Sequence, residues 1–63
     1  MKINGILTEE TFHSMEELLE KKGYQIKYVA VECNGQILPK NQFCTYVPKQ
    51  EDVIEIVSFV GGG

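Results

Sequence analysis

Residues 53–63 read VIEIVSFVGGG, an apolar stretch that predicts a β-strand and is followed at once by three glycines. Alternation divides the apolar side chains between two faces: Ile54 and Ile56 on one, and Val53, Val57 and Phe59 on the other. Apolar residues on both faces indicate a strand at the centre of a sheet, or an outer face kept apolar for a partner. The glycines are poor material for a strand or a helix, because each loses more backbone freedom on folding than any other residue.

The segment YVAVECNGQIL, residues 28–38, predicts a β-hairpin. Asn34-Gly35 is a type I′ turn signal, since both central positions of that turn favour positive φ. Pro39 is expected to end the return strand, because proline cannot donate to the ladder. The first strand again has two distinct faces, with Val29, Val31 and Cys33 on one and Ala30 and Glu32 on the other.

The stretch SMEELLEKKG, residues 14–23, predicts a helix of about two turns with a signal at each end. Ser14 is the expected N-cap, and Glu17 three positions later completes a capping box. Gly23 is expected to stop the helix as a left-handed cap. The helix carries one apolar stripe, formed by Met15, Leu18 and Leu19. A helix this short cannot stand alone, so it must lie on a sheet.

The remaining segments complete the predicted architecture. Residues 1–4 predict a short strand and Asn4-Gly5 a second type I′ turn. A further strand with a weak pattern is expected somewhere within residues 6–12. Residues 40–52 form a connection with Phe43 and Tyr46 as apolar anchors. The resulting order of elements indicates the α+β class, with one helix packed across a mixed sheet of four to five strands. We expect this domain to span residues 1–60, followed by a flexible glycine tail at residues 61–63.

Composition limits the classes of function. Sixty-three residues make one domain. A net charge of −3 and the absence of arginine argue against a nucleic-acid partner, which would require a basic face. No run is long enough to span a bilayer, and the N-terminus lacks the features of a signal peptide. We therefore expect a cytoplasmic protein without a membrane partner.

The sequence offers few candidates for catalysis or metal binding. The only histidine, His13, precedes the helix and is expected to have a structural or solvent-facing role rather than that of a general base. Cys33 and Cys44 are too far apart for a redox CxxC and too few for a zinc site, so we expect two reduced thiols, with Cys33 in the core. The adjacent acidic pairs are expected to be solvated: Glu9-Glu10, Glu16-Glu17 and Glu51-Asp52. We therefore predict no catalytic residue and no metal site.

The glycine tail itself is the remaining candidate for a reactive group. A terminal glycine carboxylate has no Cβ beside it, so it can enter a narrow channel and meet a phosphate or a sulfur nucleophile. Three extended residues would carry Gly63 about 10 Å beyond the strand. The outer face of the sheet would then dock the partner through Ala30, Val57 and Phe59, with Val60 at the base of the tail. The alternatives are a frayed end and a Phe59 that merely closes the strand.

Three stretches together resemble the ThiS family of sulfur carrier proteins in thiamine biosynthesis. They are MEELLEKKG (residues 15–23), VAVECNGQILPK (residues 29–40) and EDVIEIVSFVGGG (residues 51–63). The resemblance implies a ubiquitin-like β-grasp fold. It also implies that Gly62 and Gly63 match the family's diglycine, with Gly63 as the modified residue, and that Gly61 is one glycine more than the minimal motif.

The resemblance further implies a carrier rather than an enzyme, with no bound cofactor. A ubiquitin-activating-like, ThiF-like adenylyltransferase would use ATP to activate Gly63 after Gly61 and Gly62 thread into its active site. A sulfur donor protein would supply sulfur for a thiocarboxylate, and a ThiG-like thiazole synthase would receive it. Three alternatives stay open: the small subunit of molybdopterin synthase, a ubiquitin-like protein modifier, and a β-grasp interaction module with an inert tail.

Overall fold

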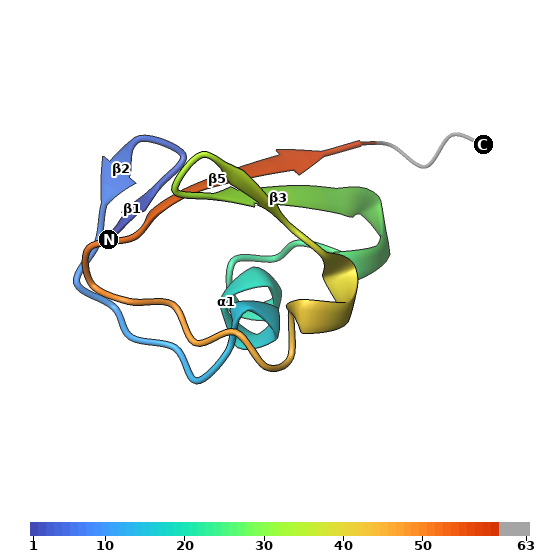
Figure 1. Cartoon of the computed structure of the whole chain (residues 1–63), viewed down its shortest axis with the longest axis horizontal. Helices are drawn as coiled ribbons and strands as arrows, with labels where there is room; N and C mark the ends of the chain where they lie inside the picture. Colours follow the sequence, from blue (N-terminus) through green and yellow to red (C-terminus); the bar gives the residue numbers. More distant parts are fainter. Residues whose placement is uncertain (60–63) are drawn as a thin grey trace.

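The fold is a five-stranded mixed sheet crossed by one helix, and the computed structural model describes residues 1–59 (Figure 1). The strands are β1 (Lys2–Ile3), β2 (Ile6–Leu7), β3 (Val29–Cys33), β4 (Gln36–Leu38) and β5 (Val53–Ser58). The helix α1 spans Met15–Lys21, and two short 3₁₀ helices span Ile26–Tyr28 and Lys40–Gln42. This arrangement confirms the predicted α+β class and the β-grasp architecture.

Strand β5 lies at the centre of the sheet, whose order is β2-β1-β5-β3-β4. It pairs in parallel with β1 and antiparallel with β3. Ile54 and Ile56 are buried under α1, whereas Val53 and Val57 are exposed on the opposite face. The apolar side chains on one face of β5 therefore belong to the core, whereas those on the other face are left uncovered.

Both predicted type I′ turns are present, and their asparagines also bond the central strand. Asn4 and Asn34 have φ values of 51° and 54°, as this turn requires. The Oδ1 atom of Asn4 accepts the Ile56 N–H at 2.6 Å, and that of Asn34 accepts the Val53 N–H at 2.9 Å. Each asparagine side chain thus accepts a backbone N–H of β5, as a carbonyl of a neighbouring strand would.

The N-terminus of α1 differs in one detail from the predicted capping box. The Ser14 hydroxyl accepts the Glu17 N–H at 3.0 Å, as expected. The Glu17 carboxylate, however, accepts the N–H of His13 at 2.7 Å, one residue before the predicted partner. The next two helical N–H groups donate to carbonyls of the connection, Met15 to Tyr46 and Glu16 to Phe43. These bonds join the first turn of the helix to residues 39–52.

Gly23 ends the helix as predicted, with a φ of 87°. Its N–H donates to the Glu20 carbonyl at 3.1 Å, and the Tyr24 N–H donates to the Leu19 carbonyl at 2.9 Å. This pair of bonds is a Schellman motif, which satisfies the last carbonyls of the helix.

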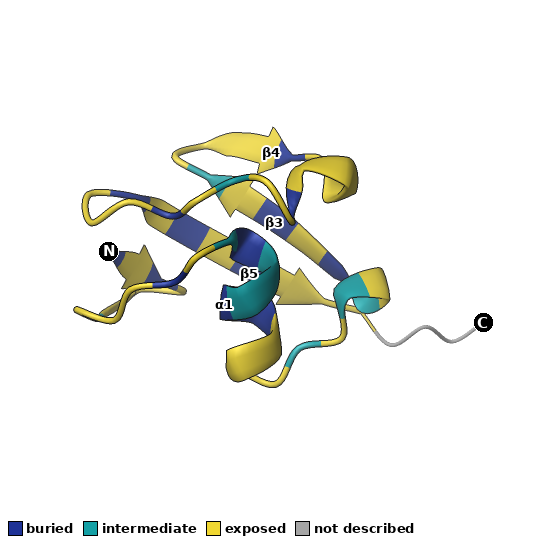
Figure 2. Cartoon of the chain, turned by 90° about the horizontal axis from the view of Figure 1, so that it is seen from below, coloured by how far each residue is buried: buried dark blue, intermediate teal, exposed yellow. Residues whose placement is uncertain are grey.

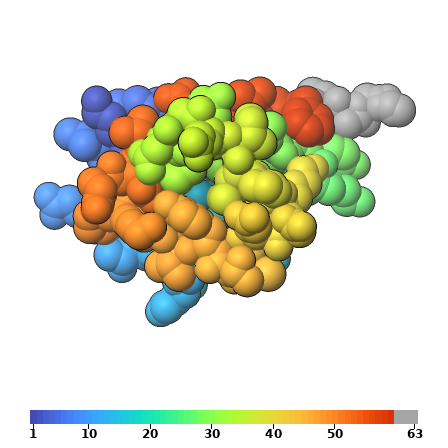
Figure 3. Space-filling model, in the orientation of Figure 1, coloured from blue at the N-terminus to red at the C-terminus, as the bar shows by residue number. Residues whose placement is uncertain are grey.

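The core lies between α1 and the sheet. The buried bands on β3 and β5 face the helix in Figure 2. The predicted stripe of Met15, Leu18 and Leu19 is fully buried against this face. Residues 39–52 cover much of α1 on the side shown in Figure 3, and Phe43 is their buried anchor. Cys33 is only partly buried and packs at the margin of the core, so its prediction as a core residue is only partly correct.

Asp52 was predicted to be solvated, and this prediction is wrong. Its side chain is 2% exposed and is the buried acidic group of the described chain. It accepts hydrogen bonds from the Asn34 amide at 2.9 Å, the Lys49 N–H at 2.9 Å and the Tyr46 hydroxyl. Burial acts to raise the pKa of Asp52, but these hydrogen bonds outweigh it, and the net result is a lowered pKa.

Tyr46 and Cys33 extend this hydrogen-bond chain. The hydrogen bond to Asp52 raises the pKa of the Tyr46 hydroxyl, and Tyr46 in turn accepts from the Cys33 thiol at 3.4 Å. Burial raises the pKa of the Cys33 thiol, which keeps it protonated. This chain of hydrogen bonds therefore links the β3–β4 turn to the connection.

Candidate functional site

The sheet face opposite α1 is the first part of the candidate site. Ala30 on β3 stands opposite Val57 on β5 in the register, and both are exposed. Val57 is 61% exposed, and Ile37 on β4 is 68% exposed. A shallow groove of about 160 Å³ crosses this face, lined by Ala30, Val31, Glu32, Ile37, Glu55 and Val57. The predicted docking residues Ala30 and Val57 therefore lie together on an uncovered apolar surface.

Phe59 is the second part of the site and lies immediately after β5. Its N–H donates to the Tyr28 carbonyl at 2.8 Å, which continues the bonding between β5 and β3 by one residue. Its side chain is 46% exposed and does not belong to the buried core. The ammonium of Lys40 lies 5.8 Å from the centre of the ring. Phe59 is thus held at the surface by its backbone, as the alternation predicted.

The third part of the predicted site, Val60 and the glycines Gly61, Gly62 and Gly63, lies outside the described residues. The boundary between residues 1–60 and residues 61–63 lies outside them as well. What the structure does place is the end of β5, which points away from the β1–β2 hairpin (Figure 1). The predicted docking residues Val57 and Phe59 therefore lie at this end of β5.

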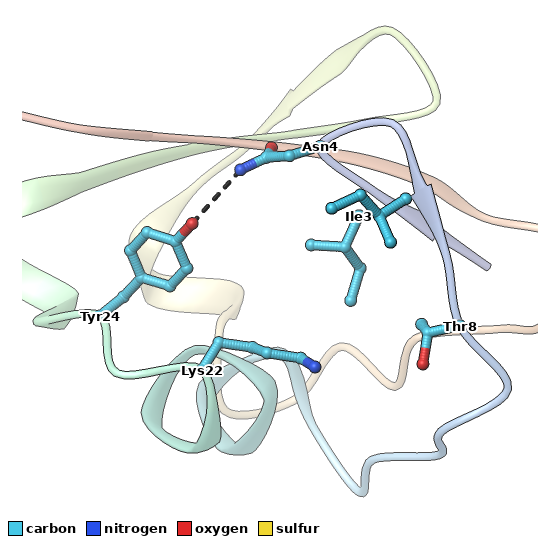
Figure 4. A pocket seen from close by; sticks show the side chains of 6 residues that line it. Ile3, Asn4, Thr8, Lys22 and Tyr24 are labelled. Atoms are coloured by element: carbon cyan, nitrogen blue, oxygen red, sulfur yellow. Dashed lines mark hydrogen bonds between the residues drawn. The ribbon is translucent and has the colours of Figure 1, made fainter.

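A separate cavity of about 220 Å³ lies between the β1–β2 hairpin and the end of α1 (Figure 4). Asn4 spans it by a hydrogen bond to the Tyr24 hydroxyl at 3.3 Å. Its one ionisable amine, Lys22, forms an ion pair with Glu10. The remaining lining is Ile3, Ile6 and Thr8. Asn4 of this cavity bonds Ile56 in the middle of β5, and the cavity shares no lining residue with the groove on the outer face.

The other candidate groups are dispersed over the described chain. The His13 side chain is 96% exposed and faces Glu17 at 3.3 Å, with no nucleophile in contact. Cys44 is exposed, and neither cysteine forms a disulfide. Among residues 1–59, no group of three His, Cys, Asp or Glu side chains could hold a metal ion. In the same part of the chain, no helix has the length and apolarity needed to cross a membrane.

Sequence reasoning missed two glutamates of the outer face. Glu32 and Glu55 line the same groove as Ala30 and Val57, and they stand directly opposite each other in the register. Alternation in β3 predicted Glu32 on the same face as Ala30, and Glu55 lies between Ile54 and Ile56, which face the core. Their juxtaposition could not be seen without the pairing of the two strands.

Comparison with known proteins identifies relatives of the whole chain. The model of the ThiS family matches residues 1–63. The crystal structure of the thiamine biosynthesis protein ThiS from Geobacter metallireducens superposes with a TM-score of 0.76 at 35% identity, covering 98% of this chain and 96% of that one. A solution structure of a thiamine biosynthesis protein from the same organism gives 0.74 at 33% identity, covering 98% and 85%.

A thiazole synthase is also similar to this chain. The enzyme of Paramagnetospirillum magneticum (strain ATCC 700264 / AMB-1) is 40% identical over 50 residues. The aligned segment covers 79% of this chain but only 15% of the enzyme. A segment of this kind therefore occurs within a much longer polypeptide.

Proposed function

The chain belongs to the ThiS family, and from that premise we propose that it is a sulfur carrier whose terminal Gly63 carboxylate becomes a thiocarboxylate for thiazole formation. The observation that carries the proposal is the family match over residues 1–63, glycines included. The uncovered apolar face beside Phe59 supports it, because a carrier needs a docking surface next to its reactive end.

The chemistry requires an activating partner, because a carboxylate is a poor electrophile. In the proposed reaction a Gly63 carboxylate oxygen attacks the α-phosphorus of ATP, and pyrophosphate leaves. Hydrosulfide released by a sulfur donor protein then attacks the acyl carbon, AMP leaves, and the product is the thiocarboxylate of Gly63. A ThiF-like adenylyltransferase would bind the ATP, so the carrier itself contributes the carboxylate and the docking surface.

Thiazole synthase is the proposed acceptor of the sulfur. The similarity to a segment within a thiazole synthase polypeptide supports this choice, because a segment similar to this chain and a thiazole synthase then form one polypeptide in that organism. A molybdopterin-synthase acceptor would use the same thiocarboxylate. Transfer assays with purified thiazole synthase and with the large subunit of molybdopterin synthase distinguish the two.

The proposal is tested by intact-mass measurement of the chain after incubation with the cognate adenylyltransferase, ATP and a sulfur source. We expect a species in which one sulfur replaces one oxygen, located on Gly63 by fragmentation. A chain that stays unmodified would instead identify an interaction module with an inert tail. Conjugates on target lysines would identify a protein modifier.

Replacing Phe59 with serine is expected to weaken binding to the adenylyltransferase by about tenfold or more, because large aromatic side chains are common interface anchors. Calorimetric titration measures the effect. Val47→Ser, at an exposed apolar position in the connection, is the matched control and should bind normally. The melting temperature of Phe59→Ser should change little, since the ring lies outside the core. An unchanged affinity of Phe59→Ser would show that Phe59 does not contribute to the interface.

A further inference from the structure

Two glutamates face each other at the centre of the outer sheet surface. Glu32 on β3 is the register partner of Glu55 on β5, and both residues are exposed. Directly opposed residues on antiparallel strands have Cα atoms about 4.5–5.5 Å apart. Like charges at that separation destabilise a sheet. The free protein therefore carries an unfavourable pair at the centre of its sheet.

Neither glutamate forms an ion pair within the described chain. The two ion pairs among residues 1–59 are His13–Glu17 and Lys22–Glu10, and both lie elsewhere. Neither Glu32 nor Glu55 has a side-chain hydrogen bond in that range. Lys2 shares the outer face, but its register partners are Val53 and Leu7. The two carboxylates thus present acceptor atoms to whatever covers this face.

The surroundings of the pair are apolar. Ile37 stands opposite Glu32 on the other side, so that the row reads Ile37, Glu32, Glu55 across three strands. The next row toward Phe59 is Ala30 and Val57. These side chains line the 160 Å³ groove together with the glutamates. The two carboxylates are therefore surrounded by apolar side chains in this groove.

Arginine matches this surface better than lysine does. Its guanidinium is a planar fork of N–H donors that can bond two carboxylates at once, whereas an ammonium is a compact point charge. Its aliphatic stem covers apolar surface while the charged head reaches its partner. Val57 lines the groove and lies two residues before Phe59, so a protein that binds Phe59 would lie beside the groove.

We propose that Glu32 and Glu55 together receive one arginine side chain of the adenylyltransferase, with its stem against Ala30, Ile37 and Val57. This inference rests on the proposed function, and it adds residues that the alternation of apolar side chains does not reveal. The pairing strengthens the docking of the carrier on its partner, whereas the reaction at Gly63 does not depend on it.

The double variant Glu32→Gln/Glu55→Gln tests the proposal. We expect its dissociation constant for the adenylyltransferase to rise about thirtyfold, because a desolvated charge pair is lost. The salt dependence of binding should weaken, whereas pyrophosphate exchange at saturating carrier should approach the wild-type rate. Its melting temperature should stay unchanged or rise, since the repulsion is removed. Glu9→Gln/Glu20→Gln makes the same change in net charge at exposed sites off the sheet and should bind normally.

Phenylglyoxal labelling of the adenylyltransferase identifies the partner group directly. We expect one arginine to be protected by the wild-type carrier and labelled in the presence of Glu32→Gln/Glu55→Gln. Three outcomes would each overturn this inference and leave the proposed function standing. They are the absence of any protected arginine, an unchanged affinity of Glu32→Gln/Glu55→Gln, and an equal loss of affinity in both double variants. Absence of pyrophosphate exchange with the wild type would instead overturn the proposed function, and the inference with it.

Discussion

Deleting Gly63, or adding one residue after it, is expected to abolish adenylation by the activating enzyme. The reactive carboxylate must sit at a fixed distance from the docked domain, and each added or removed residue shifts it by up to about 3.5 Å. Misplacement of a reacting group by even 1 Å can reduce a rate about a hundredfold. Pyrophosphate exchange measures the loss, and normal exchange by the extended variant would contradict a fixed reach.

Control measurements distinguish the effect of tail length on exchange from an effect on folding and from an effect of side-chain size. Melting temperatures should match the wild type, because the core is built from residues between Met1 and Ile56. Gly62→Val keeps the length but restricts φ and adds a branched side chain, so it should also block threading. Gly62→Ala, with a single methyl, should retain more exchange than Gly62→Val. Equal activity of the valine variant would show that no narrow channel receives the tail.

Local signals in the sequence predicted the turns, the caps and the faces of the strands. Asn4-Gly5 and Asn34-Gly35 both adopt the positive φ values that their turn requires. Ser14 and Gly23 bound the helix as expected. These features depend on residues a few positions apart, so a short window of sequence contains their causes. The order of the strands required the resemblance to a family, because periodicity does not specify neighbours.

Features that depend on distant residues could not be predicted in this way. Asp52 is buried because Asn34, 18 positions earlier, and Tyr46 both bond it. The adjacency of Glu51 and Asp52 in the sequence says nothing about this environment. In the candidate site, alternation predicted the exposure of Val57 and Phe59. The opposition of Glu32 and Glu55 depends on the register of β5 against β3, which no turn between those strands sets.

Replacing Asp52 with alanine is expected to lower the free energy of unfolding by about 3 kcal/mol, because three partly buried hydrogen bonds lose their charged acceptor. For a domain of this size the loss corresponds to a melting temperature lower by about 15 °C. Chemical and thermal denaturation measure the effect. Glu51→Ala, at the exposed neighbour, is the matched control and should change stability by less than about 0.5 kcal/mol. If Asp52→Ala lost as little unfolding free energy as Glu51→Ala, the hydrogen bonds of Asp52 would not stabilise the fold.

The same variant should also change how stability depends on pH. The pKa of Asp52 is lower in the folded protein than in the unfolded chain, so its contribution is fully present above the unfolded value of about 3.9. The contribution is lost as the pH falls from there through the folded pKa. The difference in unfolding free energy between the wild type and Asp52→Ala should therefore be constant near neutrality and shrink below about pH 4. If this difference in unfolding free energy stayed the same at lower pH, the stability lost in Asp52→Ala would come from packing and not from the charge of Asp52.

The position of the network predicts that this loss of stability leaves the proposed carrier chemistry intact. Asp52 precedes β5, and the Val53 N–H bonds Asn34, so the network holds the start of the strand. Phe59 lies beyond the other end, where its N–H bonds the Tyr28 carbonyl. Well below its melting temperature, Asp52→Ala should therefore exchange pyrophosphate at nearly the wild-type rate. Loss of exchange by a variant that is still folded would show that the two ends of β5 are coupled.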